Sequence, residues 1–228
     1  MIRKRHQQGG FTIIEMIVSL GVFSVVITVA VGALLLLVAS NRQLQEEQIV
    51  MTNLSFALDS MTREIRVGSA YFCETRPNYN AGGSSNIFSA DNNLDVALDI
   101  DDVDDCSQGR EPDNHDLHGL AFIEGGESIT DGSDRRILYY IDYSQGVNEP
   151  RQIMRRIGNQ AADPVTSSDI HIERLDFFVT GSTPQTSTNN DQPIVTIIIE
   201  ASNASERANP NRSIKRLQTT ITQRTLDL

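Results

Sequence analysis

One long apolar stretch dominates the hydropathy pattern of the chain, and it lies close to the amino terminus. Between Met16 and Ala39 none of the 24 side chains is ionisable, and most of them are Val, Ile or Leu. A helix of this length extends for roughly 36 Å, whereas the hydrocarbon core of a bilayer is about 30 Å thick. The pattern therefore predicts that residues 11–39 form a transmembrane helix.

A second helical pattern follows without a proline to interrupt it. Apolar residues recur at spacings of seven, three, four, three and four, at Leu44, Met51, Leu54, Leu58, Met61 and Ile65. This stripe predicts an amphipathic extension of the helix over residues 40–67, with Gly68 at its end. The stripe either packs on the chain's own domain or is reserved for a partner. We favour the first interpretation because burial in a core is the usual fate of such stripes.

The residue pattern in the second half of the chain predicts β-structure. Runs rich in β-branched and aromatic residues predict strands at 120–123, 137–143, 152–157, 172–179, 194–200 and 213–225. Short turns between several of them favour antiparallel pairing. Residues 74–118, rich in Gly, Pro, Asn, Asp and Ser, predict an irregular region. The predicted fold class is α+β: one long helix packed on an antiparallel sheet, with residues 68–228 as a β-rich domain.

Charge adds an orientation and excludes one class of partner. The 30 acidic residues outnumber the 19 Lys and Arg, for a net charge of -11, and tryptophan is absent. Such a chain lacks the clustered cations that nucleic-acid binding needs, so no nucleic-acid partner is expected. Arg3, Lys4 and Arg5 stand ahead of the apolar stretch. This asymmetry predicts a cytoplasmic amino terminus, a single pass through the cytoplasmic (inner) membrane and an exported domain.

Glu15 is the feature that an ordinary membrane anchor does not explain. A cleaved secretory signal has a shorter apolar region, and a signal-anchor helix needs no carboxylate at its start. A carboxylate within a membrane-length segment is costly unless it finds a partner. Cleavage between Gly10 and Phe11 would create an α-amino group near the depth of Glu15. That amine could neutralise the carboxylate, within one chain or between neighbouring chains.

Residues 10–15, Gly-Phe-Thr-Ile-Ile-Glu, resemble the cleavage and methylation signature of type IV pilins and type II secretion pseudopilins. The resemblance implies that a prepilin peptidase removes residues 1–10 as a basic leader and that Phe11 becomes N-methylated. It also implies that Glu15 guides docking into a filament of other pilin-like subunits, built at an inner-membrane assembly platform. The order of elements and the size of the chain resemble the J-type pseudopilin and the W-type minor pilin. Some tip pseudopilins lack this carboxylate, so Glu15 argues against the terminal subunit.

The two cysteines, Cys73 and Cys106, both fall on the predicted exported side. Oxidation is permitted there, so a disulfide is favoured over two free thiols. A site for zinc built from four cysteines is excluded because there is no second pair.

Nothing in the chain predicts a metal centre, a cofactor or catalysis. A dense acidic run comprises Asp99, Asp101, Asp102, Asp104 and Asp105. It lacks the glycine and closing glutamate of a calcium loop, so a solvated acidic loop is favoured over a calcium site. His115 and His118 provide too few ligands for zinc. No motif of a nucleophilic, phosphate-binding or metalloprotease site occurs.

The prediction is a structural protein: a low-copy subunit of a type IV pilus or secretion pseudopilus, at or near the tip, that aids the initiation of assembly. The alternative is an adhesin or substrate-recruiting module on a pilin stalk, with residues 74–118 as its contact surface. A membrane-tethered exported enzyme is a third and weaker interpretation.

Overall fold

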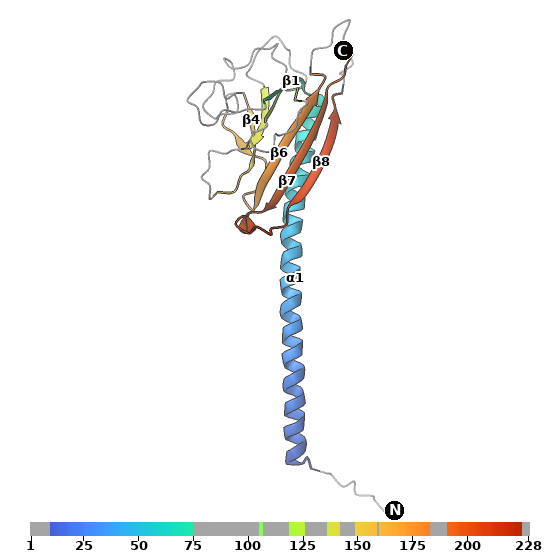
Figure 1. Ribbon diagram of the computed structural model, residues 1–228, viewed down its shortest axis with the longest axis vertical. Coiled ribbons are helices and arrows are strands. Elements are labelled where there is room, and N and C mark those ends of the chain that lie inside the picture. Colours follow the sequence, from blue (N-terminus) through green and yellow to red (C-terminus); the bar gives the residue numbers. More distant parts are fainter. Residues whose placement is uncertain are drawn as a thin grey trace, which may run out of the picture. The chain divides into compact units, whose positions relative to one another are not determined.

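A computed structural model describes residues 10–74, 105–106, 119–125, 136–141, 149–158, 160–182 and 191–224. Within these residues one long helix precedes eight strands and a short 3-10 helix (Figure 1). The elements are α1 (Ile13–Val67), β1 (Ser69–Glu74), β2 (Gly119–Ile123), β3 (Arg136–Ile141), β4 (Ile153–Ile157), β5 (Asp163–Pro164), β6 (Ile170–Thr180), β7 (Ile194–Asn203), η3 (Ala204–Glu206) and β8 (Lys215–Thr222). The chain divides into two compact units, residues 1–46 and residues 47–228.

The first unit contains the amino-terminal part of α1, whose apolar side chains are exposed. By length and composition, α1 is the one helix among the described residues that could cross a membrane. None of the residues in its most apolar stretch is buried. The hydroxyls of Ser24 and Thr28 donate 2.8 Å hydrogen bonds to the carbonyls of Leu20 and Ser24, respectively. These polar groups are thus satisfied within the helix, as a lipid environment requires.

The second unit is built from two antiparallel sheets and the carboxyl-terminal part of α1. One sheet has five strands in the order β1-β2-β3-β4-β5, and the other has three in the order β6-β7-β8. Every strand pair is antiparallel, which confirms the predicted α+β class. The six predicted strands correspond to β2, β3, β4, β6, β7 and β8. Sequence patterns missed β1, which follows the helix after a single residue, and β5, which has two residues.

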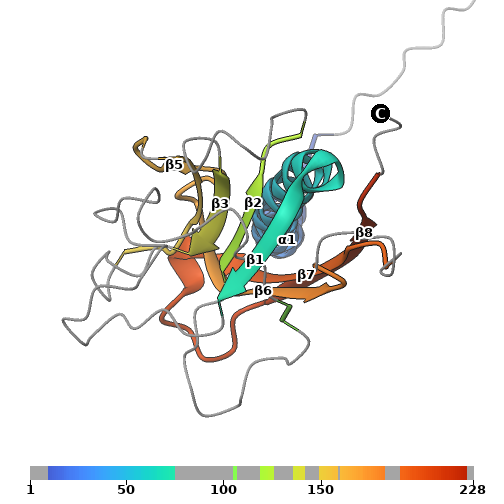
Figure 2. The same ribbon diagram turned by 90° about the horizontal axis from the view of Figure 1, so that it is seen from above.

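Within the second unit, seen from above, the carboxyl-terminal part of α1 lies over the three-stranded sheet, with β2 beside it (Figure 2). The buried face of α1 consists of Val50, Leu54, Ala57, Met61 and Ile65. These side chains share one core with the inward faces of both sheets, including Tyr139 of β3 and Ile197 of β7. Burial of such a stripe supplies most of the helix's stability, because propensity alone is marginal in water.

The prediction that one apolar stripe of α1 is buried is correct at three positions and wrong at others. Leu54, Met61 and Ile65 are fully buried, and Leu58 is partly buried against the core. Met51 is 38% exposed and Leu44 is 55% exposed, whereas Val50 and Ala57 are buried in their place. The buried positions follow spacings of four, three, four and four, which track a straight α-helix better than a heptad does.

The helix ends at Val67 for two reasons that involve Gly68 and Tyr71. A Cβ atom on Gly68 would lie 2.4 Å from Cδ2 of Phe122, so only glycine lets β2 approach this closely. The buried hydroxyl of Tyr71 lies 2.6 Å from the carbonyl oxygen of Ile65 and 2.8 Å from that of Gly68. The hydroxyl has one hydrogen to donate, and its contact with the Ile65 carbonyl supplements the hydrogen bond that this carbonyl accepts from the N–H of Gly68 at the helix end. Gly68 ends the helix, as the sequence predicted.

Candidate functional site

The candidate processing site lies at the start of the described chain, immediately before α1. Gly10 and Phe11 precede the first helical residue, Ile13. Phe11 is 80% exposed, and a Cβ atom on Gly10 would have no heavy atom within 4 Å. The peptide bond between them is therefore open on the surface of this unit. The sequence pattern predicted a helix from residue 11, whereas in the structure Phe11 precedes the first helical residue, Ile13.

Thr12 caps the amino terminus of α1. Its side-chain oxygen accepts a 3.4 Å hydrogen bond from the backbone N–H of Glu15, and its carbonyl oxygen accepts from the same N–H at 3.1 Å. Threonine at the cap with glutamate three residues later is the sequence pattern of a capping box. Glu15 lies in the first turn, where the helix dipole favours negative charge. The segment is thus shaped by local interactions that its own sequence encodes.

The family match found by comparison with known proteins covers this amino-terminal segment. A family model described as the prokaryotic N-terminal methylation motif matches residues 5–31. No curated protein and no solved structure matches the chain significantly. The motif match supports a subunit of the type IV pilin and pseudopilin class, which a prepilin peptidase processes and which assembles with other pilins. The apolar helix also fits a membrane-anchored pilin.

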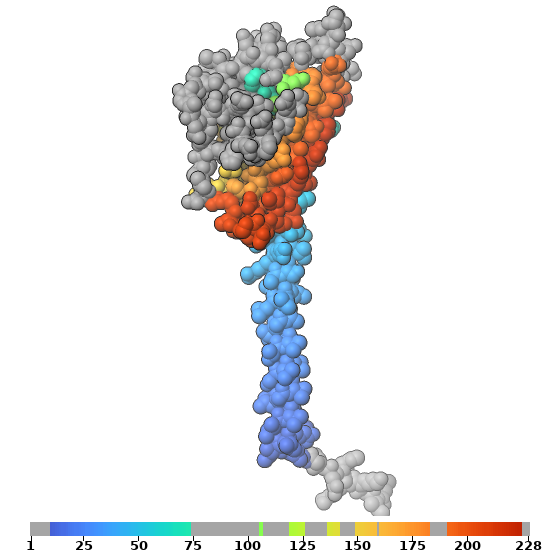
Figure 3. All heavy atoms as spheres, in the orientation of Figure 1, coloured from blue at the N-terminus to red at the C-terminus, as the bar shows by residue number. Residues whose placement is uncertain are grey.

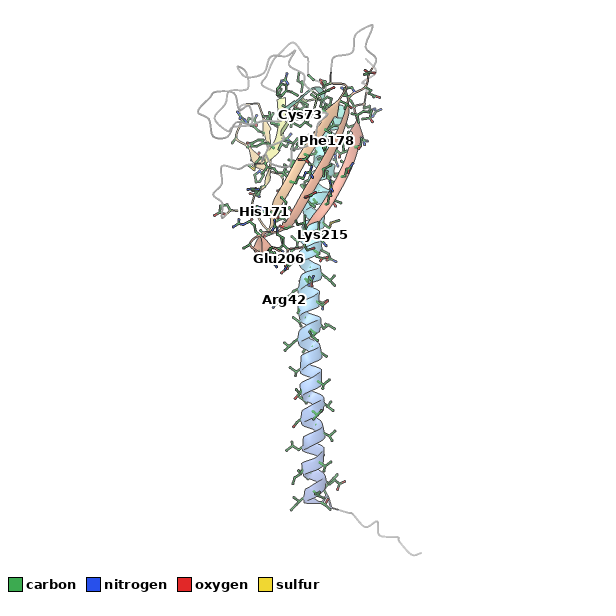
Figure 4. All side chains as sticks on the ribbon, in the orientation of Figure 1. Arg42, Cys73, His171, Phe178, Glu206 and Lys215 are labelled. Carbon is green, nitrogen blue, oxygen red and sulfur yellow. A yellow bond between two sulfur atoms is a disulfide. The ribbon has the colours of Figure 1, made fainter. Side chains whose placement is uncertain are left out.

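The disulfide favoured by the sequence is present in the structure. Cys73 of β1 is bonded to Cys106, with 5.8 Å between the two Cα atoms and a sequence separation of 33. Both side chains are 2% exposed and belong to the main core. The bridge therefore closes a loop of residues 74–105, which make up most of the segment 74–118 that the sequence predicted to be irregular. Figure 4 shows Cys73 in the second unit, away from the end that carries Glu206.

Asp105 is the one member of the acidic run within the described residues; Asp99, Asp101, Asp102 and Asp104 lie outside them, as do His115 and His118. Its carboxylate accepts hydrogen bonds from the backbone N–H groups of Gly181, at 3.1 Å, and Ser182, at 2.8 Å. Burial opposes ionisation, but these hydrogen bonds outweigh it and lower the pKa of Asp105. Across the described ranges no three His, Cys, Asp or Glu side chains are arranged to hold a metal ion.

Sequence reasoning missed an ionic cluster that joins α1 to the five-stranded sheet. Glu64 accepts a 2.7 Å hydrogen bond from the hydroxyl of Tyr139. The guanidinium of Arg155 contacts the same carboxylate at 2.8 and 3.0 Å. Tyr139 faces Arg155 across the β3–β4 pair, so strand register brings both to the glutamate. These partners lie 75 and 91 positions from Glu64, so no local spacing signals the cluster.

Proposed function

We propose that the chain is a minor pilin or minor pseudopilin, a low-copy subunit at or near the tip of a type IV pilus or type II secretion pseudopilus. Prepilin peptidase cuts between Gly10 and Phe11, and the new amino terminus of Phe11 is methylated. Residues 11–39 hold the subunit in the cytoplasmic membrane, with its amino terminus in the cytoplasm. Residues 40–67 continue the helix into the exported domain, residues 68–228. By order of elements and size, the subunit resembles the J-type pseudopilin and the W-type minor pilin.

The observation that carries the proposal is a carboxylate in the first turn of a membrane-length helix, directly behind an accessible processing bond. A charge at membrane depth costs several kcal/mol, about 3 on insertion scales, unless it is neutralised. The amine freed on Phe11 supplies that neutralisation. Lateral packing of apolar helices from neighbouring subunits supplies the rest of the free energy of assembly.

The position in the filament is inferred from the size and build of the domain. In the described part of the chain, two sheets with eight strands follow the helix, and the outer face of the three-stranded sheet forms part of the domain's surface (Figure 3). A subunit with so large a domain is better suited to a few places at the end of a filament than to its repeating shaft. The role is structural: the subunit helps to initiate assembly with other pilin-like subunits at the membrane platform.

Two substitutions test processing and assembly separately. Gly10→Val should block cleavage without disturbing the fold, since a side chain at this position meets no atom within 4 Å. Glu15→Ala should be cleaved normally but be depleted from sheared filaments. Glu46→Ala, which removes a glutamate of the same helix beyond residue 39, is the matched control and should behave as the native chain does. Mass spectrometry of the amino terminus and immunoblots of the filament fraction measure both steps. Equal recovery of Glu15→Ala and the control would overturn the proposal.

A second candidate function is a binding module on a pilin stalk, and the disulfide favours it. Cys73 and Cys106 hold the two ends of residues 74–105 together in the core, which gives an inserted segment a fixed base. Replacing residues 75–104 by a Gly-Ser linker, with both cysteines kept, separates the two functions. Intact filaments that lose adhesion or secretion would favour binding, whereas lost filaments would favour the assembly role.

A further inference from the structure

His171 is a buried histidine that the proposed assembly role does not use. It is the second residue of β6 and is 6% exposed. Its Nδ1 atom accepts a 3.0 Å hydrogen bond from the backbone N–H of Arg151. The carbonyl oxygen of Arg151 in turn accepts a 3.0 Å hydrogen bond from the N–H of Ile172. Arg151 leads into β4 of the five-stranded sheet, so this junction of two hydrogen bonds ties one sheet to the other.

The junction requires a neutral imidazole in one tautomer. When Nδ1 accepts a hydrogen bond, the ring proton of a neutral histidine sits on Nε2. A protonated imidazole carries a proton on both nitrogens and accepts no hydrogen bond. When His171 is protonated, the N–H at Nδ1 faces the backbone N–H of Arg151. Two donors cannot hydrogen-bond to each other, so this hydrogen bond is lost.

The surroundings of His171 resist protonation. Burial is the largest influence and lowers its pKa, and the guanidinium groups of Arg151, Arg207 and Arg212 lower it further. These cations come from the segment before β4, the turn after η3 and the segment before β8. The carboxylate of Glu173, on the same strand, opposes them but does not reverse the shift.

Glu173 is itself held by other partners. Arg212 binds it with two nitrogens, at 2.5 Å to Oε1 and 2.8 Å to Oε2, and the hydroxyl of Ser202 donates to Oε1 at 2.8 Å. Ser202 faces His171 across the β6–β7 pair. Figure 4 shows His171 near Glu206, at the end of the sheet where β7 turns through η3. The carboxylate therefore remains engaged with Arg212, and its attraction for an imidazolium does not reverse the lowering of the His171 pKa.

We propose that His171 is a pH-sensitive junction between the two sheets: its neutral ring holds the segment before β4 on β6, and acid protonates the ring and releases that segment. The release is local, because Ile153 has its own hydrogen bonds to the loop after β5. Its N–H donates to the hydroxyl of Thr166 at 3.1 Å, and its carbonyl accepts from Val165 at 2.8 Å.

The direction of the pH effect follows from linkage. A histidine whose pKa is lower in the folded state stabilises that state fully above its unfolded pKa, about 6.5. The contribution is lost as the pH falls below that value toward the folded pKa. Each pH unit within this window favours opening by up to about tenfold. This inference rests on the proposed function in one respect: if the domain is exported, His171 experiences the pH outside the cytoplasm.

Hydrogen exchange of the full-length chain in detergent micelles tests the junction directly. The protection factor of the Arg151 amide should fall by up to about tenfold per pH unit below pH 6.5. In His171→Asn the side-chain oxygen takes the place of Nδ1 and does not titrate, so protection of this amide should stay constant. In His171→Phe the acceptor is gone, and protection should be low at every pH. The amide of Ile197 in the middle strand should keep its protection in all three proteins.

Two results would overturn the proposal. One is a parallel loss of Arg151 protection in the native chain and in His171→Asn. The other is a ¹⁵N spectrum of the native chain in which the imidazole of His171 carries its proton on Nδ1 or becomes protonated above pH 6.5. The spectrum decides the question even where a variant does not fold. Neither measurement depends on filament assembly, so a failed pilin assignment and a failed junction are distinguishable.

Discussion

The hydroxyl of Tyr139 donates a 2.7 Å hydrogen bond to Oε2 of Glu64, and this bond joins the five-stranded sheet to helix α1. Tyr139 is fully buried, and burial together with the carboxylate raises its pKa, so the hydroxyl stays protonated as a donor. Arg155 neutralises the same carboxylate. A partly buried charge is stable here because both of its oxygens have partners.

Tyr139→Phe should therefore lower the free energy of unfolding by about 1 kcal/mol, since one hydrogen bond is lost. Glu64→Ala should cost about 3 kcal/mol, because it leaves a buried hydroxyl and a guanidinium without their partner. Asp59→Ala is the control, because its ion pair with Arg63 is exposed and such pairs contribute less than about 1 kcal/mol. Denaturant titration in detergent measures all three. A loss for Asp59→Ala as large as that for Glu64→Ala would contradict this account.

Gly68→Ala should destabilise the chain by about 1–3 kcal/mol, because the new methyl would overlap the ring of Phe122 at 2.4 Å. Gly125→Ala should be at least as harmful, since its Cβ would lie 2.4 Å from the backbone oxygen of Val67. Gly32→Ala has no atom within 4 Å of the added carbon and should cost nothing. Thermal unfolding of the three variants compares them. Adding Phe122→Leu should rescue Gly68→Ala and leave Gly125→Ala unchanged.

Ala70→Gly should stabilise the protein by about 1 kcal/mol. Ala70 has a φ of 51°, in the left-handed region, at the point where the β1–β2 register shifts. A side chain in this conformation costs roughly 1–2 kcal/mol, and glycine avoids that cost but loses more chain entropy on folding. Ala57→Gly, in the buried face of α1, should instead lose about 1 kcal/mol. Opposite signs for the two substitutions are the expected result, and equal losses would refute the argument.

Acid should weaken the Glu173–Arg212 pair in a lower pH window than it affects His171. Burial opposes ionisation of Glu173, but hydrogen bonds from Arg212 and Ser202 outweigh it and lower its pKa. The stability that the pair adds is therefore present above about pH 4.5 and is lost as the pH falls below it. Glu173→Gln should unfold more easily at pH 7 and lose this part of the pH dependence. A pH series of unfolding midpoints, with exposed Asp59→Asn for comparison, measures the effect.

Replacing both Cys73 and Cys106 by alanine should lower stability by about 4 kcal/mol, from the entropy that the open segment gains in the unfolded chain. Reduction of the native protein with dithiothreitol should cause a loss of similar size. Denaturant titration of oxidised, reduced and double-alanine protein provides the comparison. Equal stability of all three would show that the bridge contributes nothing.

Six of the eight described strands were predictable because their signals are local, whereas β1 and β5 were missed. A run such as residues 194–200 has one β-branched residue after another, and the capping pattern of Thr12 and Glu15 spans a single turn. The stripe on α1 was ambiguous for a physical reason. Residues 50 and 51 are both apolar, as are 57 and 58, and only the position of the sheets decides which of each pair is buried.

The division into two sheets and the polar contacts within the domain were not predictable in this way. Nothing in the residues between β5 and β6 distinguishes a turn within one sheet from a change of sheet. The partners of Glu64, and the meeting of His171 with the backbone of Arg151, depend on strand register between distant segments. Such contacts can be identified only when the fold is known.

The segment around Cys106 also covers one border of the three-stranded sheet. The N–H of Val179 donates to the carbonyl of Cys106 at 3.1 Å, and the next N–H groups, of Gly181 and Ser182, donate to Asp105. Backbone donors left open at a sheet border recruit strands from other molecules and so promote aggregation. At this end of β6 those donors are already occupied within the same molecule. These occupied donors therefore hinder copies of the domain from joining sheet to sheet along this part of β6.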